Sequence, residues 1–184
     1  MSSLDSFSRK GWVVLFVFVV TQIVYLAMVL VTLPHLRSLA GGLEPFDLLP
    51  GGYDMDYARR LLEAIGSEGR AFYLTRQIPL DLLYPGLFAA TFAMVWLWLF
   101  ARLSSPSPLL RAGALLPIVV GIADYAENAL VVTMLIGFPN LSKGVVKAAS
   151  LFTVTKSMAT VLYFVALLCL LAVVGVRRYR AGRP

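Results

Sequence analysis

The chain has 184 residues, of which 59% are hydrophobic and only 14% are charged, and its mean hydropathy is +0.81. This composition excludes a soluble globular domain, which needs a larger share of polar residues to face water, and indicates an integral membrane protein. The net charge of +6 is not a nucleic-acid signature, because the basic residues flank apolar segments as topology determinants do, and we expect no nucleic-acid partner.

The cysteine and histidine content limits the chemistry further. Cys169 is the only cysteine and His35 the only histidine, which excludes an internal disulfide, a CxxC pair and a multi-histidine metal site within one chain. The Gly-x-Ser-x-Gly, His-Glu-x-x-His and glycine-rich phosphate-loop motifs are also missing from the sequence. We therefore expect no cofactor and no metal.

Four apolar runs are each long enough to cross a bilayer, which requires about 20 helical residues. Lipid cannot satisfy backbone polar groups, so these runs predict helices; they extend over about 11–33, 79–101, 109–138 and 145–176. The predicted fold is all-α: one membrane domain over 1–184, a polytopic integral membrane four-helix bundle. A cleaved signal peptide is the less favoured interpretation of the first run, which is much longer than the usual apolar region of such peptides.

The basic residues predict the orientation of the chain in the membrane. With the N-terminus inside, eight lysines and arginines lie on the cytoplasmic side and seven on the outer side. This bias is small, but the Arg177-Arg178-Tyr179-Arg180 cluster after the last run is a strong cytoplasmic anchor. We expect a protein of the plasma (inner) membrane with both the N-terminus and the C-terminus in the cytoplasm.

The polar segment 34–78 links the first two runs. After glycine-rich turns it predicts short helices over about 54–65 and 67–76, with Asp54 and Ser67 as N-caps and Gly66 as the stop between them. Four apolar residues of the first helix recur at helical spacing and predict one buried face: Ala58, Leu61, Leu62 and Ile65. Two interpretations stay open, an amphipathic lid resting on the bundle or the membrane surface and a lid over a cavity.

Polar residues within the apolar runs carry the functional information. Gln22, Glu127 and Lys156 belong to three different runs, and each lies about 16 Å from the outer end of its run. An ionisable side chain that faces lipid costs several kcal/mol, so these groups should face inward and pair. We predict a buried Glu127–Lys156 ion pair, with Asp124, Asn128 and Gln22 completing a hydrogen-bond network.

The predicted binding site extends beyond this network. Thr160 and Tyr163 continue the stripe of Lys156, and Asp81 and Tyr84 begin the second run at its outer end. Asp81 either enters the same cavity or is a carboxylate favoured by the start of its helix. Asp124 and Glu127 together outnumber the single lysine, so a proton, a cation or a basic ligand is the natural third partner. The alternative is a cluster that only holds the helices together.

Three pieces of the sequence together resemble a family of small four-span membrane proteins of no known activity. The pieces are Leu61-Leu62-Glu63-Ala64-Ile65-Gly66-Ser67-Glu68-Gly69-Arg70 followed by Tyr73, Leu80-Asp81 followed by Pro85, and Asp124-Tyr125-Ala126-Glu127-Asn128. They span about residues 53–130. The resemblance implies a four-helix membrane protein, and it implies neither an activity nor roles for individual residues.

Three functions remain open on the sequence. The first is a binding or transport module whose buried site holds or moves a proton, a cation or a small amphipathic ligand. The second is a membrane-embedded enzyme that modifies a lipid or isoprenoid with Asp124 or Glu127 as general acid or base. The third is a structural accessory subunit of a membrane complex. The lipid bilayer is the expected partner, and assembly as a homo-oligomer or within a larger complex stays open.

Overall fold

The computed structural model describes residues 10–103 and 108–181. Within these ranges the chain is helical and contains no strand, which confirms the predicted all-α class. Four helical stretches are long and apolar enough to cross a membrane, as predicted; they are Gly11–Leu39, Gly66–Phe100, Leu110–Gly137 and Lys143–Arg180.

Three of the four stretches contain a local change of helix type. The first consists of α2 (Gly11–Ala27), the π-helical turn η1 (Met28–Thr32) and α3 (Leu33–Leu39). The second consists of α5 (Gly66–Phe72), the π-helical turn η3 (Tyr73–Gln77) and α6 (Ile78–Phe100). The third consists of α7 (Pro108–Ala112), the 3-10 turn η4 (Gly113–Leu115) and α8 (Leu116–Gly137), and the fourth is α9 (Lys143–Ala181).

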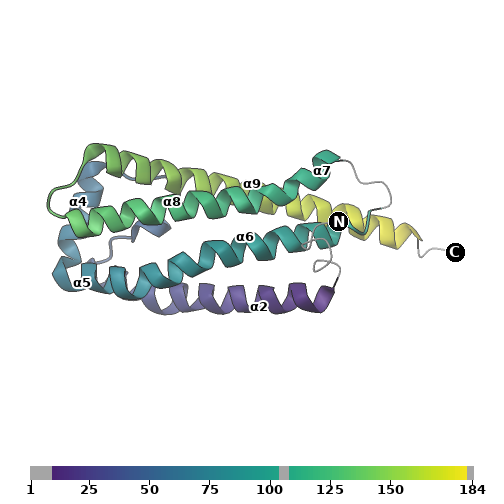
Figure 1. Cartoon of the computed structure of the whole chain (residues 1–184), viewed down its shortest axis with the longest axis horizontal. Helices are drawn as coiled ribbons and strands as arrows, with labels where there is room; N and C mark the ends of the chain where they lie inside the picture. The colour runs from purple at the N-terminus through teal and green to yellow at the C-terminus, as the bar shows by residue number, and fades with distance from the viewer. Residues whose placement is uncertain (1–9, 104–107, 182–184) are drawn as a thin grey trace.

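The long helices follow one another in space in the order α2, α6, α8, α9 (Figure 1). α2 packs on α6, α6 on α8 and α8 on α9, whereas α2 and α9 make little contact with each other. The bundle is therefore open along one side, between its first and last long helices. The beginning of α2 and the end of α9 lie at the same end of the molecule, and α4 (Met55–Ala64) and α5 lie at the opposite end (Figure 1).

Both π-helical turns come just before a proline. η1 precedes Pro34 and η3 precedes Pro79, and the helix continues through each proline, beyond the predicted limits at 33 and 79. Proline lacks a backbone N–H and clashes with the carbonyl four residues earlier, and a local widening of the helix accommodates both effects. The Thr32 hydroxyl donates to Gln77 Oε1, so the two widened turns are bonded to each other.

The predicted amphipathic helix between the first two spans is present as α4. Asp54 Oδ1 accepts a hydrogen bond from Tyr57 N at 2.8 Å, as an N-cap does, and Gly66 ends the helical segment with φ +62°. The predicted apolar face is buried in a hydrophobic cluster that includes residues of α8 and α9. Its members Ala58, Leu61, Leu62 and Ile65 are each at most 4% exposed. Ser67 does not cap the next helix, because α5 begins at Gly66 without a side-chain cap.

Residues 46–53, which we call the strap, precede α4 and include the short 3-10 turn η2 (Phe46–Leu48). Phe46 is fully buried against the rings of Tyr53 and Tyr73, and Tyr53 N donates to Ser150 Oγ of α9 at 2.8 Å. Gly52 has φ +80°, and a Cβ there would lie 2.6 Å from Ser150 Oγ, so only glycine fits. The strap is thus fastened both to the second span and to α9.

An aromatic core fills the other half of the bundle. Trp96 is 3% exposed and donates from Nε1 to Leu110 O at 2.8 Å, so this tryptophan is a core residue. Tyr163 is fully buried in the same core, where its hydroxyl donates to Phe92 O at 2.8 Å. This core lies toward the helix ends that are farther from the strap, whereas the polar residues discussed next lie nearer the strap.

Candidate functional site

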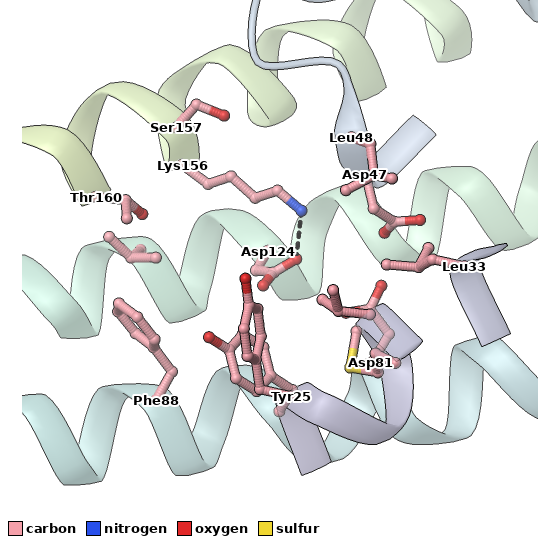
Figure 2. A pocket seen from close by; sticks show the side chains of 14 residues that line it. Tyr25, Leu33, Asp47, Leu48, Asp81, Phe88, Asp124, Lys156, Ser157 and Thr160 are labelled. Carbon is pink, nitrogen blue, oxygen red and sulfur yellow. Dashed lines mark hydrogen bonds and ion pairs between the residues drawn. The ribbon is translucent and has the colours of Figure 1, made fainter. Parts of the chain in front are cut away.

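A cavity of about 330 Å³ lies between α2 and α9, next to the strap, and is partly open to the surface. All four long helices and the strap contribute to its wall (Figure 2). The polar lining residues are Tyr25, Asp47, Asp81, Tyr84, Asp124, Lys156, Ser157 and Thr160, and the apolar ones are Met28, Val29, Leu33, Leu48, Phe88 and Val120.

Lys156 is the centre of the charge network. Its Nζ atom lies 2.9 Å from Asp124 Oδ1 and 2.6 Å from Glu127 Oε2, so the predicted Glu127–Lys156 ion pair is present and extends to Asp124. Glu127 is fully buried, and its other oxygen accepts a hydrogen bond from Thr153 at 2.7 Å. Asp124 and Glu127 on α8, and Thr153 and Lys156 on α9, are each spaced three residues apart, which places each pair on one face of its helix.

Asp81 is 2% exposed and lines the cavity. Of its two predicted locations, it therefore occupies the one inside the cavity. Its position depends on Pro85, one turn later in α6, which has no N–H to donate to the Asp81 carbonyl. Asn128 Nδ2 of α8 donates to that carbonyl at 2.8 Å. Asn128, which was predicted to join the network, therefore supplies the hydrogen bond that the Asp81 carbonyl would otherwise lack.

Asp47 is an acidic residue of the cavity that was not predicted from the sequence. It belongs to the strap, yet its carboxyl group points into the cavity (Figure 2) and accepts a hydrogen bond from the Tyr73 hydroxyl. A hydrogen bond with Asp81 is among the causes that lower the pKa of Asp47. An ionised carboxylate has no proton to donate, so such a bond requires one proton shared between the two side chains.

The ionisation of Asp47 follows from its surroundings. Burial alone would raise its pKa, but the hydrogen bonds with Asp81 and Tyr73 and the positive charge of Lys156 outweigh burial, and the pKa of Asp47 lies below its ordinary value of 3.8. Asp47 is therefore the ionised member of its pair at neutral pH. In the neighbouring strap residue Tyr53, burial and the charge of Glu127 raise the pKa, which keeps that phenol neutral.

The cluster has more acid than base. Four carboxyl groups belong to it, those of Asp47, Asp81, Asp124 and Glu127, and Lys156 is the basic residue among the described residues that line the cavity. With one proton between Asp47 and Asp81 and with Asp124 and Glu127 both ionised, three carboxylates would face one ammonium group, an excess of two negative charges. Such an excess is costly away from water unless a proton or a cation compensates it.

Buried polar atoms without a hydrogen-bond partner gather around the same cluster. Within the described ranges such side-chain atoms are Asp47 Oδ1, Tyr53 OH, Gln77 Nε2, Asp81 Oδ2, Glu127 Oε2 and Asn128 Oδ1. The ion pair with Lys156 accounts for Glu127 Oε2. Most buried polar groups of a protein are satisfied, so the remaining atoms mark this region as one suited to a polar ligand or to ordered water.

Two predicted site residues lie outside the cluster. Gln22 is half-buried and makes no hydrogen bond with the described residues, while the adjacent Thr21 is fully buried and bonds Thr91 on α6 at 2.6 Å. Tyr163 belongs to the aromatic core. The reason is the same for both: the rotation of a helix about its axis is set by packing, and hydrophobic runs with little amphipathicity do not define it. Tyr84 and Thr160 do line the cavity.

The acidic cluster does not have the arrangement of a metal site. In the described part of the chain, no three histidine, cysteine, aspartate or glutamate side chains are grouped closely enough to hold a metal ion. Glu127, moreover, is not among the cavity-lining residues. Of the two acid/base candidates named from the sequence, only Asp124 is therefore placed to touch a molecule in the cavity.

The chain was also compared with known proteins. No protein-family model, no curated protein and no solved structure matches it. What the cavity holds has to be inferred from its own geometry, charge and lining.

Proposed function

We propose that this protein binds a positively charged amphipathic molecule in the cavity between α2 and α9, in exchange for the proton shared by Asp47 and Asp81. The observation that carries the proposal is the excess of carboxyl groups over lysine around one cavity that also has an apolar lining. A site built only to hold helices together would balance its charges, because every uncompensated charge lowers stability.

The charge of the cluster favours a cation over a neutral or anionic ligand. Asp124 and Glu127 form ion pairs with Lys156, whereas neither Asp47 nor Asp81 belongs to an ion pair among the described residues. A cation placed beside Asp47 and Asp81 would replace the shared proton and leave both carboxylates ionised. Such exchange makes binding of the cation dependent on pH, because protons and ligand compete for the same oxygens.

The surroundings favour an amphipathic ligand that reaches the site through the bilayer. The strap lies over the cavity with Asp47 and Leu48, and the other apolar lining residues belong to three of the helical stretches able to span a membrane: Met28, Val29 and Leu33 to the first, Phe88 to the second and Val120 to the third. Two further hollows adjoin the cavity. One of about 220 Å³ shares Val29, Leu33 and Leu48 with it, and one of about 420 Å³ shares Ser157. An apolar body lying there would keep its charged group at the acids.

Hexylammonium is a suitable probe for this proposal. With detergent-solubilised protein at neutral pH, we expect its addition to raise the unfolding midpoint, by an amount that keeps growing with the logarithm of its concentration above the dissociation constant. The double variant Asp81→Asn/Asp124→Asn should lose this stabilisation, because it removes two of the carboxyl groups that would balance the bound cation. Asp54→Asn is the matched control, since it removes a carboxylate from the exposed start of α4 and asparagine is an equally good N-cap. If hexylammonium raised the unfolding midpoint equally in all variants, or did not raise it in wild type, the proposal would be contradicted.

The same proposal includes the location of the protein. We place it in the plasma (inner) membrane with both chain ends in the cytoplasm, on the strength of the arginine cluster at 177–180. This puts the strap and α4 on the outer side (Figure 1). Assembly with further copies or with a larger membrane complex stays open, because α2 and α9 both carry exposed apolar residues toward the surroundings.

A further inference from the structure

The wall of the cavity includes three aromatic rings. Tyr25 of α2 and Tyr84 of α6 have ring centroids 5.7 Å apart, with 30° between their planes, and Tyr84 and Phe88 have centroids 5.8 Å apart. All three residues line the same cavity as Asp47, Asp81 and Asp124. Figure 2 shows Tyr25 and Phe88 on the side of the cavity opposite Lys156, with Asp124 between. The lysine and the rings thus occupy different walls.

This combination of rings and carboxylates suits one class of cation better than others. The face of an aromatic ring carries partial negative charge and attracts a cation within about 6 Å, most strongly where water is excluded. Sodium and divalent ions prefer a shell of several oxygens, and the described residues offer no group of acids arranged for a metal. A primary ammonium group needs a hydrogen-bond acceptor for each of its three N–H donors, and the ring faces of Tyr25, Tyr84 and Phe88 supply none on their side of the cavity.

We infer that the cation is a substituted ammonium group, whose alkyl substituents contact Tyr25, Tyr84 and Phe88 while its charge is balanced by Asp47, Asp81 and Asp124. The inference rests on the proposed function and names the ligand class for the same site. Quaternary and tertiary ammonium groups spread their charge over apolar substituents. They can therefore contact ring faces and carboxylates at once without leaving a donor unsatisfied.

A matched pair of probes tests the inference. Benzyltrimethylammonium and benzylammonium share one apolar body and differ at the nitrogen, and sodium chloride serves as the inorganic comparison. By titration calorimetry of the full-length protein in detergent at neutral pH, we expect the methylated probe to bind about five- to thirtyfold more tightly than the primary one, the range of a cation–π contribution at a desolvated site. Sodium at equal concentration should not displace it.

Two variants at Tyr84 assign the preference to the aromatic wall. Tyr84→Phe keeps the ring and should keep the preference for the methylated probe, whereas Tyr84→Leu should bring the two probes to within about twofold of each other. If Tyr84→Leu does not fold, Tyr25→Leu probes the same wall at a residue that is 40% exposed and so tolerates substitution better.

The possible failures are distinguishable. Benzylammonium binding as tightly as the methylated probe, or an unchanged preference in the leucine variants, would overturn the aromatic recognition and leave the cation site itself in place. Displacement by sodium would overturn it in favour of an inorganic cation. If neither organic probe binds wild type, the proposed function fails together with the inference.

Discussion

Lys156 is the single residue on which the charge network depends most. Its ammonium group contacts both Asp124 and Glu127, and Glu127 is fully buried. Replacing it by methionine leaves buried carboxylates without a cation, so we expect Lys156→Met to lower the free energy of unfolding by about 3–5 kcal/mol at neutral pH. The loss should shrink at acid pH, where the carboxylates take up protons. Denaturant unfolding in mixed micelles measures both effects.

A double variant separates charge from packing in that result. Glu127→Gln/Lys156→Met removes the Glu127–Lys156 pair while nearly keeping the volumes of both side chains, and it should recover part of the lost stability, because Asp124 alone then stays without its cation. A Lys156→Met single variant as stable as wild type at neutral pH would mean that the two carboxylates are not held in a dry interior.

Individual residues differed in how far they could be predicted. Glu127, Lys156, Asp124, Asn128 and Asp81 stood out because a polar side chain within an apolar run must have a partner inside the bundle. Asp47 gave no such signal, since an acid in a proline- and glycine-rich loop is ordinarily solvated. Its apolar neighbours Phe46 and Leu48 were the available hint, because an acid between two large apolar residues is drawn inward when they pack.

At the scale of helices, the close contact between α6 and α8 depends on Gly121. A Cβ at this position would lie 2.9 Å from the backbone oxygen of Pro85 and 3.2 Å from Ala89 Cβ. Because backbone cannot yield as a side chain does, we expect Gly121→Ala to separate the helices and to destabilise the protein by about 1–3 kcal/mol.

Gly137 provides the control for that prediction in the same helix. A Cβ at Gly137 would meet no atom within 4 Å, so Gly137→Ala should be neutral or slightly stabilising in the same unfolding measurement. If Gly121→Ala and Gly137→Ala changed the free energy of unfolding equally, α6 and α8 would not be in close contact at Gly121.

The strap depends on Asp47, which bonds Tyr73 and Asp81. Asp47→Ala removes both bonds and should expose the strap to limited proteolysis, whereas Asp47→Asn, which can accept from Tyr73 and donate to Asp81, should retain most of the protection. The pKa of Asp47 is depressed, so its contribution to stability is present above its ordinary value of 3.8 and is lost as the pH falls through the lowered value. Cleavage that is equally slow in both variants would place the anchoring of the strap elsewhere.

The four spans were predicted in number and type but not at their ends, and the predicted helix over 67–76 is continuous with the second span. The predicted limits at 33 and 79 lie beside Pro34 and at Pro79, and proline ordinarily interrupts the backbone hydrogen bonds of a helix. The helices continue because η1 and η3 widen in front of each proline, and the Thr32–Gln77 bond joins the two turns. Such a solution depends on a neighbouring helix, and a pattern within one segment carries no information about its neighbour.

At the scale of the whole molecule, the proposed orientation can be tested by labelling cysteines from outside the cell. In a Cys169→Ser background, Glu63→Cys on the exposed side of α4 should react with a membrane-impermeant maleimide in intact cells. A cysteine added after residue 184 should react only after the membrane is opened. The opposite pattern would invert the orientation, and reaction at both positions would contradict an even number of membrane crossings.

The open arrangement of the bundle was beyond the sequence analysis. Hydropathy identified four helices able to span a membrane, but it does not say which of them touch, because lipid-facing and partner-facing apolar surfaces look alike in composition. The proposed function depends on this arrangement. α2 and α9 make little contact with each other, and the strap lies beside the opening between them. Acidic residues of the strap, α6 and α8 line the cavity inside.

Proton release on ligand binding tests the central claim most directly. Benzyltrimethylammonium has no proton of its own to lose, so any proton released on binding comes from the protein. Titration calorimetry at one pH, in two buffers of different ionisation enthalpy, should reveal release of about one proton per ligand bound to wild type. Binding heats that are the same in both buffers, or that correspond to proton uptake, would contradict exchange of a cation for the proton between Asp47 and Asp81.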